Sequence, residues 1–203
     1  MSTEKNMKKQ IVAAVLGVAV VCGVGVGIAA NALTTDPPQK SRTSAGSTLT
    51  PVSRLVVKPG AVGPVAIGTS RRAALASGYF VRGVSPVEGC PAPPLAWRQA
   101  YADALDVQTL GNGTISSIGI RGKGPRTKQG LGVGSTWGEV RKYTDAAHEA
   151  GYGQSGAYVY DRQAGGYVGF LFNESLARLS DASKVTFVEV TQGSEPGLTR
   201  DGC

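Results

Sequence analysis

The side chains able to carry out chemistry in this chain of 203 residues are few and far apart. Its single histidine, His148, precedes Glu149, but Tyr152 stands where the His-Glu-x-x-His pattern of a zinc protease has its second histidine. The sequence also lacks the Gly-x-Ser-x-Gly elbow that presents a hydrolase serine. We therefore predict no catalytic residue, no metal ligand and no cofactor, and we expect a protein that is not an enzyme.

A glycine-rich stretch from Gly130 to Thr136 (GLGVGST) has the composition of a phosphate-binding loop. A Walker loop has a lysine directly before its Ser or Thr, however, and Gly134 occupies that position. A dinucleotide-binding fingerprint needs a further glycine and a parallel βαβ unit. The stretch is better explained as a turn before a helix, with Thr136 and Glu139 forming a capping box.

Four cations, Arg121, Lys123, Arg126 and Lys128, lie within eight residues of one another. Such a cluster is able to bind an anionic envelope polymer or a lipid head group. The glycines and the proline between them also fit a solvated connector, and no aromatic side chain is present there to stack on bases. These four are candidate partner-binding residues, and we expect no nucleic-acid partner.

Aromatic side chains form a second candidate surface. Tyr158 and Tyr160 project to the same side of a predicted strand, because side chains alternate along it. Trp97 and Arg98 are expected in a neighbouring strand. Aromatic residues and arginine are enriched in the hot spots of protein interfaces, so these four are also candidate partner-binding residues. The competing interpretation is that the rings pack beneath the helices.

The net charge of +7 belongs partly to the N-terminus. Residues 1–10 carry three lysines, and the uncharged residues 11–33 are long enough to cross a membrane. The lysines orient the rest of the chain to the outside of the cell. We predict a cytoplasmic tail (1–10), a single transmembrane anchor (11–33) and a disordered stalk (34–54), since the stalk has too few apolar residues to fold. The alternative is a signal peptide cleaved after Ala32, which would release a secreted protein.

The remainder is predicted to be an α+β domain of two repeats, 55–127 and 128–203, each a helix followed by antiparallel strands. The motif at residues 65–70 (VAIGTS) recurs at residues 131–136 (LGVGST), and helices are expected at Arg71–Ala76 and from Thr136 to about Ala150. Hairpins are expected around residues 106–120 and 157–172, and a last strand at residues 184–191. The expected fold is one sheet with the helices on one face.

Two cysteines, Cys90 and Cys203, lie in the part of the chain predicted to be extracellular. Cysteines in an oxidising compartment usually pair, so we predict a Cys90–Cys203 disulfide. The third, Cys22, falls within the predicted membrane segment.

The stretch from Gly63 to Thr69 (GPVAIGT), with Gly124 to Thr127 (GPRT) leading into Gly130–Thr136, resembles small exported proteins of high-G+C Gram-positive bacteria. The two-part organisation is also similar to the tandem repeats of beta-lactamase inhibitory protein and the BamE-like envelope lipoproteins. This resemblance implies a binding or envelope-support module. The cysteine placement differs from that of the inhibitory protein, so no inhibitor residue is carried over.

From these observations we predict a non-enzymatic extracellular domain, anchored in the cell membrane, that binds a protein or an anionic envelope polymer. The alternative is a secreted hydrolase, or a hydrolase inhibitor, released after Ala32.

Overall fold

A computed structural model describes residues 49–85, 88–89 and 91–199. By its internal contacts the chain divides into two units, Met1–Ala45 and Gly46–Cys203, and the described residues all belong to the second. The predicted tail, the predicted membrane segment, most of the predicted stalk, Cys90 and Cys203 lie outside the described residues. Within them, no helix has the length and apolar character needed to cross a membrane.

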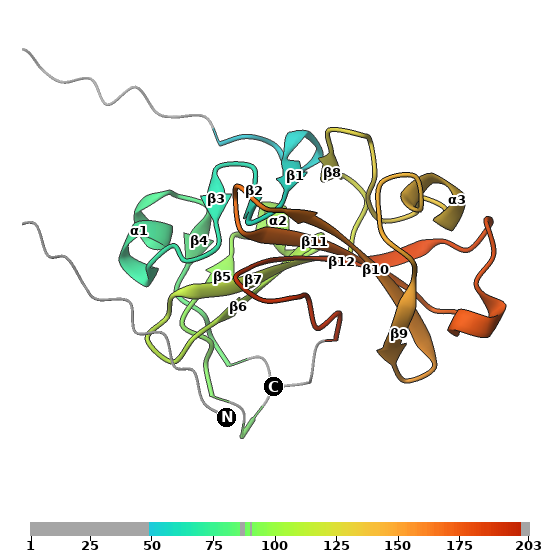
Figure 1. Cartoon of the computed structure of the whole chain (residues 1–203). Helices are drawn as coiled ribbons and strands as arrows, with labels where there is room; N and C mark the ends of the chain where they lie inside the picture. Colours follow the sequence, from blue (N-terminus) through green and yellow to red (C-terminus); the bar gives the residue numbers. More distant parts are fainter. Residues whose placement is uncertain (1–48, 86–87, 90, 200–203) are drawn as a thin grey trace, which may run out of the picture. The chain divides into compact units, whose positions relative to one another are not determined.

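The described part is mostly β-structure, with twelve strands in three sheets and three short helices (Figure 1). The strands are β1 (Val56–Lys58), β2 (Ala61–Val62), β3 (Val65–Ala66), β4 (Phe80–Val81), β5 (Ala96–Trp97), β6 (Leu105–Thr109), β7 (Ile115–Ile120), β8 (Arg126–Thr127), β9 (His148–Gly151), β10 (Gln154–Asp161), β11 (Gly166–Phe172) and β12 (Val185–Gln192). The helices are α1 (Arg71–Ala76), α2 (Gln99–Ala102) and α3 (Trp137–Val140), and single 3-10 turns cover Val52–Arg54 and Leu176–Arg178.

The largest sheet is fully antiparallel and has six strands in the order β6-β7-β12-β11-β10-β9. Its hairpins β6–β7 and β10–β11 confirm the hairpins expected from the turn residues between alternating apolar runs. The last predicted strand is β12, at the centre of this sheet. A four-stranded sheet, β3-β2-β1-β8, and the short pair β4–β5 complete the fold.

The main core lies on one face of the six-stranded sheet. Alternate residues of its strands, such as Phe170 and Phe172 of β11 and Val188 and Val190 of β12, are almost fully buried there. Val57, Val62 and Val65 of the small sheet, and Leu55 just before it, belong to the same cluster. This face is therefore covered by the small sheet together with the three short helices, which contribute Ala74, Tyr101 and Val140, whereas the sequence predicted helices alone.

The opposite face of the six-stranded sheet carries a smaller apolar cluster of Leu171, Phe187 and Leu198. Leu198 belongs to residues 193–199, which follow β12 and which we call the C-terminal strap. The strap lies so close to the sheet that a Cβ at Gly169 would come within 2.8 Å of Leu198 Cδ2 and of Pro196 Cβ. Glycine is required at this position by the close approach of the strap.

The predicted α+β class, with two repeats forming one sheet and helices on one face, is wrong. The clearest error is the helix expected from Thr136 to about Ala150: α3 ends at Val140, and His148–Gly151 form strand β9. Val140 is buried, but Tyr143, three residues further along, is 50% exposed, so the apolar spacing does not continue as a buried helix face. The edge of β10 instead offers backbone hydrogen bonds, and tertiary pairing outweighs the local helix preference.

The predicted helix starts are confirmed. Ser70 accepts a hydrogen bond from the N–H of Ala73 at the start of α1, and Thr136 and Glu139 form the expected capping box at α3. Each preceding turn also bonds to the first residue of a central strand: Gly68 N–H donates to Ile115 O, and Gly134 N–H to Val185 O, both at 2.8 Å. Beyond these turns the two halves differ in the number and order of their strands.

The folded domain begins earlier than predicted. The sequence predicted a disordered stalk over residues 34–54 and the start of the domain at Leu55. Thr50 is held by two tyrosine hydroxyls: its N–H donates to Tyr79 Oη at 3.0 Å, and its carbonyl accepts from Tyr101 Oη at 2.9 Å. Leu49 and Val52 pack against the main core. Residues 49–54 therefore belong to the folded domain.

Candidate functional site

Two adjoining hollows lie between strands β1 and β8, the chain around α3, and strand β10. Their volumes are about 540 and 400 Å³, and they share Gln129, Leu131 and Tyr143 as lining residues. We call the two together the basic groove, because six basic and only two acidic side chains line it. The basic residues are Lys58, Arg126, Lys128, Lys142, Arg162 and Lys184.

The loop along one wall of the groove is held by its own hydrogen bonds. Arg126 donates through Nη1 to the carbonyl of Gly130 at 2.8 Å and to Ser135 Oγ at 3.3 Å. Thr127 and Leu131 are joined by two further bonds, and Gly130 adopts a positive φ of 80° at the turn between them. This wall is therefore preformed, and Arg126 has a structural role in it.

Five of the six cations have no partner in the described part of the chain. The ion pairs found there are Arg121–Asp106 and Arg141–Asp181, and neither contains a lysine of the groove. The side chains of Lys58, Lys128, Lys142, Arg162 and Lys184 form neither an ion pair nor a hydrogen bond with a described residue. Several unpaired cations around one concave surface create a positive potential that attracts anions.

Both acidic residues of the groove are occupied by backbone hydrogen bonds. Asp161 Oδ1 accepts from the N–H groups of Gln163 and Ala164 in the β10–β11 turn. Glu139 accepts from the N–H of Thr136 at 2.7 Å, and this bond, aided by the charges of Lys184 and Lys142, lowers the pKa of the Glu139 carboxyl. Neither carboxylate neutralises a groove cation by direct contact.

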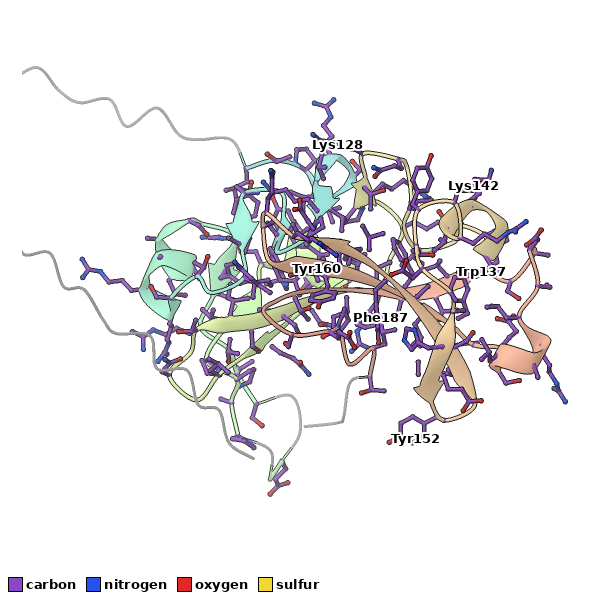
Figure 2. The ribbon with its side chains drawn as sticks, viewed as in Figure 1. Lys128, Trp137, Lys142, Tyr152, Tyr160 and Phe187 are labelled. Carbon is purple, nitrogen blue, oxygen red and sulfur yellow. The ribbon has the colours of Figure 1, made fainter. Side chains whose placement is uncertain are left out.

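The lining of the groove also has an apolar part, formed by the buried Leu131 and Val168 and by Val159. Tyr143 and Tyr160, 50% and 49% exposed, line it as well. In Figure 2, Lys128 and Lys142 lie on one side of the six-stranded sheet and Phe187 and Tyr152 on the other. The groove thus combines an apolar hollow with a cationic rim, as many ligand-binding pockets do.

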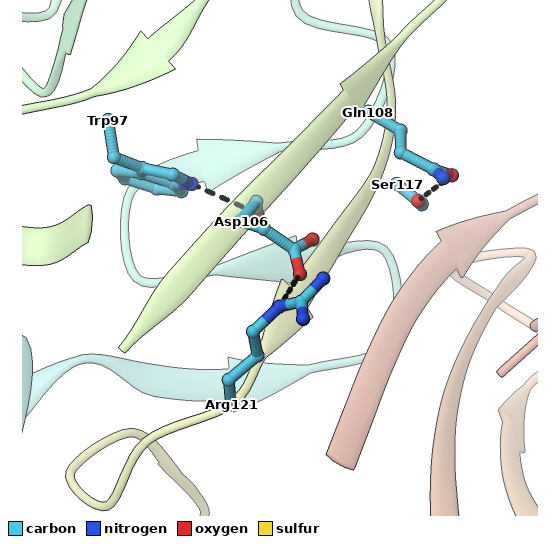
Figure 3. Close-up of polar contacts among 5 residues, drawn as sticks. All are labelled: Trp97, Asp106, Gln108, Ser117 and Arg121. Carbon is cyan, nitrogen blue, oxygen red and sulfur yellow. Dashed lines mark hydrogen bonds and ion pairs between the residues drawn. The ribbon is translucent and has the colours of Figure 1, made fainter. Parts of the chain in front are cut away.

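Of the predicted aromatic surface, Trp97 lies in the core. It is 4% exposed, packs against Phe80 with ring centroids 4.2 Å apart, and donates from Nε1 to the carbonyl of Asp106 at 3.0 Å (Figure 3). The competing interpretation, packing inside the domain, is correct for this residue. Arg98 is exposed, and its Nε donates to the carbonyl of Gly78.

Tyr158 and Tyr160 project to the same side of β10, as predicted, but only Tyr160 lines the groove. Tyr158 is partly buried, contacts the ring of His148 and donates to the carbonyl of Pro196 in the strap. Burial, with smaller contributions from the charges of Glu195 and Glu189, raises the pKa of Tyr158. Tyr160 stacks on Tyr167 with centroids 4.4 Å apart.

The predicted basic cluster is divided by the fold. Arg121 forms an ion pair with Asp106, with 2.6 Å between Nε and Oδ2 (Figure 3). Its guanidinium also lies over the ring of Phe187. Lys123 is exposed but does not line the groove, whereas Lys128 does both. Lys58, Lys142, Arg162, Lys184 and Tyr143 were missed, because they come from separate segments that only the fold brings together.

His148 has no catalytic neighbourhood in the described part of the chain. Its Nε2 is buried without a hydrogen-bond partner there, and its ring packs on Tyr158 with centroids 4.2 Å apart. Groups of three or more potential metal ligands are absent from the described residues. These observations give no support to a hydrolase centred on His148.

Comparison with known proteins adds little to this picture. Neither the known protein families nor the curated proteins give a match to the chain. Among solved structures, the chain is similar to the uncharacterized protein yfeY from Escherichia coli, with 16% sequence identity and a TM-score of 0.44. The similarity covers 68% of this chain and 99% of that one.

Proposed function

We propose that this chain is a non-enzymatic binding domain of the cell envelope, anchored by residues 11–33, and that the basic groove holds an anionic ligand. The single observation that carries this proposal is the set of unpaired cations around a preformed hollow. Cations gathered in this way repel one another, and an anionic ligand relieves the repulsion. The secreted-hydrolase alternative has no comparable support.

The proposal predicts which residues matter and which do not. Lys128 and Arg162 line the groove. Lys123 lies in the same basic segment as Lys128 and is also exposed, but it lies outside the groove. The double substitution Lys128→Glu with Arg162→Glu should therefore abolish ligand binding. Lys123→Glu is the control: it reverses one charge in the same basic segment but outside the groove, whereas the double substitution reverses two charges inside it.

The test uses the full-length chain purified in detergent. Fluorescently labelled poly(glycerol phosphate) and polyglutamate serve as anionic probes, and dextran serves as an uncharged one. We expect at least one anionic probe to bind, and the double variant to weaken that binding by more than about tenfold while Lys123→Glu changes it little. Equal binding by the double variant and by Lys123→Glu would show that the groove is not the site.

A further inference from the structure

Strand β10 is longer than the strand that covers its outer side. Its eight residues, Gln154–Asp161, pair with β11 over Ser155–Asp161, but β9 pairs only with Gln154, Ser155 and Gly156. Residues 157–161 therefore have a neighbouring strand on one side only. They form an open edge on the side of β10 where β9 would pair if it were longer. The β9–β10 turn lies at the other end of β10 (Figure 1).

The backbone of this edge has unused hydrogen-bonding groups. In an antiparallel sheet, the N–H and C=O groups of alternate residues point away from the neighbouring strand. Within the described residues, no segment other than the β10–β11 hairpin forms a hydrogen bond with the backbone of residues 157–161, although the side chain of Tyr158 donates to the carbonyl of Pro196. The exposure of this row increases along the strand, from the fully buried Ala157 to the exposed Tyr160 and Asp161. Its exposed end is a template for an added strand.

The opposite edge of the same sheet, strand β6, is partly covered. There, the Nε1–H of Trp97 in β5 bonds to the carbonyl of Asp106 in β6, so a ring covers part of the edge. Proteins also protect free edges by placing charged residues on them. In residues 157–161, however, the sequence Ala-Tyr-Val-Tyr-Asp contains a single charge, at Asp161.

The basic groove follows this open edge. Its lining includes Val159, whose side chain packs against the core, and Tyr160, whose side chain lies on the opposite face. Because these two side chains lie on opposite faces of the sheet, a hollow lined by both must run along the edge of β10. Facing β10 across the hollow are Lys128 and Tyr143.

We infer that the groove binds an extended, acidic segment of polypeptide, which adds to β10 at residues 157–161 as a further strand. This inference rests on the proposed function and specifies its ligand. The open backbone groups bind the main chain of the segment, the apolar lining of the groove takes an alternate apolar side chain, and the unpaired cations meet its carboxylates. An anionic polymer without peptide groups would satisfy only the last of these three features.

The experiment uses the full-length chain in detergent and a labelled peptide of alternating glutamate and valine. A second peptide has the same side chains but carries N-methyl groups on alternate amides, which removes the donors along one edge. Fluorescence anisotropy measures affinity, and hydrogen exchange measures protection of the amides between Ala157 and Asp161. Tyr143→Ala removes a ring that lines the groove, and Tyr152→Ala, at the exposed tip of the β9–β10 turn, is its control.

We expect the unmodified peptide to bind, the N-methylated peptide to bind at least about tenfold more weakly, and the outward amides of residues 157–161 to gain protection. Tyr143→Ala should weaken binding and Tyr152→Ala should not. Equal binding of the two peptides, or no gain of protection, overturns the inference even where poly(glycerol phosphate) binds and the proposed function stands. If none of the anionic probes binds, both proposals fail.

Discussion

The backbone N–H of Leu198 donates a hydrogen bond of 2.7 Å to the carboxylate of Glu189, and both residues are almost fully buried. Glu189 lies on a central strand, on the face opposite the main core. A hydrogen bond to a charged acceptor in a buried setting is stronger than a neutral one. This contact, together with the bond from Tyr158 Oη to Pro196 O, fixes the C-terminal strap to the sheet.

Gly169→Ala tests the strap. The new Cβ would meet Leu198 and Pro196 at 2.8 Å, so the strap must shift, and we expect a loss of about 1–3 kcal/mol in the free energy of unfolding. Urea denaturation measures it. Gly111→Ala is the control, because a Cβ there meets nothing within 4 Å. If both variants have the same stability, the strap does not pack as described.

Trp97→Ala and Trp97→Phe separate packing from hydrogen bonding in the aromatic cluster. Loss of the buried ring should cost about 3–5 kcal/mol. Phenylalanine retains a ring but not the Nε1 donor to Asp106, so it should cost about 1–3 kcal/mol. Chemical denaturation of the full-length variants gives both values. A loss near zero for both substitutions would contradict a buried position for Trp97.

The capping box of α3 gives the stability a pH dependence of known sign. The lowered pKa of Glu139 means that the folded state holds its carboxylate ionised at pH values where the unfolded chain begins to protonate. Its contribution is therefore complete above the unfolded pKa of about 4.5 and is lost as the pH falls through the lower, folded value. Glu139→Gln should make the loss of stability below that pH less steep. Unfolding curves recorded at a series of acidic pH values measure the difference, and identical slopes would argue against the capping box.

Binding at the basic groove should depend on salt. The cations of the groove are exposed, so raising the salt concentration screens their attraction for an anion. The affinity for an anionic probe should fall steadily between low and high ionic strength, and Lys128→Glu should flatten this dependence. Titrations at several salt concentrations provide the measurement. An affinity independent of salt would mean that the charges do not contribute to binding.

The sequence predicted local structure well wherever a short motif decides it. The N-caps at Ser70 and Thr136, and the hairpins around residues 112 and 163, are set by side chains within a few positions of one another. The helix predicted beyond Val140 was wrong, although the apolar residues there have helical spacing. Residues 148–151 instead gain backbone hydrogen bonds from β10, and local spacing carries no information about that neighbouring strand.

The candidate site was predicted only in part, for a related reason. Lys128 and Tyr160 were singled out, but their companions Lys58, Arg162 and Lys184 are isolated in the sequence and meet only in the fold. Trp97 and Arg121, both candidates for partner binding, bond within the domain instead. Residue type alone does not separate a ring or cation on the surface from one that stabilises the domain itself.

The two tyrosine hydroxyls that hold Thr50 also determine how the domain responds to mechanical load. Tension applied to the chain from its N-terminal side reaches the domain first at residues 49–54, ahead of β1. The bonds from Tyr79 and Tyr101 must break, and Leu49 must leave the core, before the force is transmitted to the sheets. Residues 49–54 are therefore the first part of the described domain to bear a force applied from the N-terminal side.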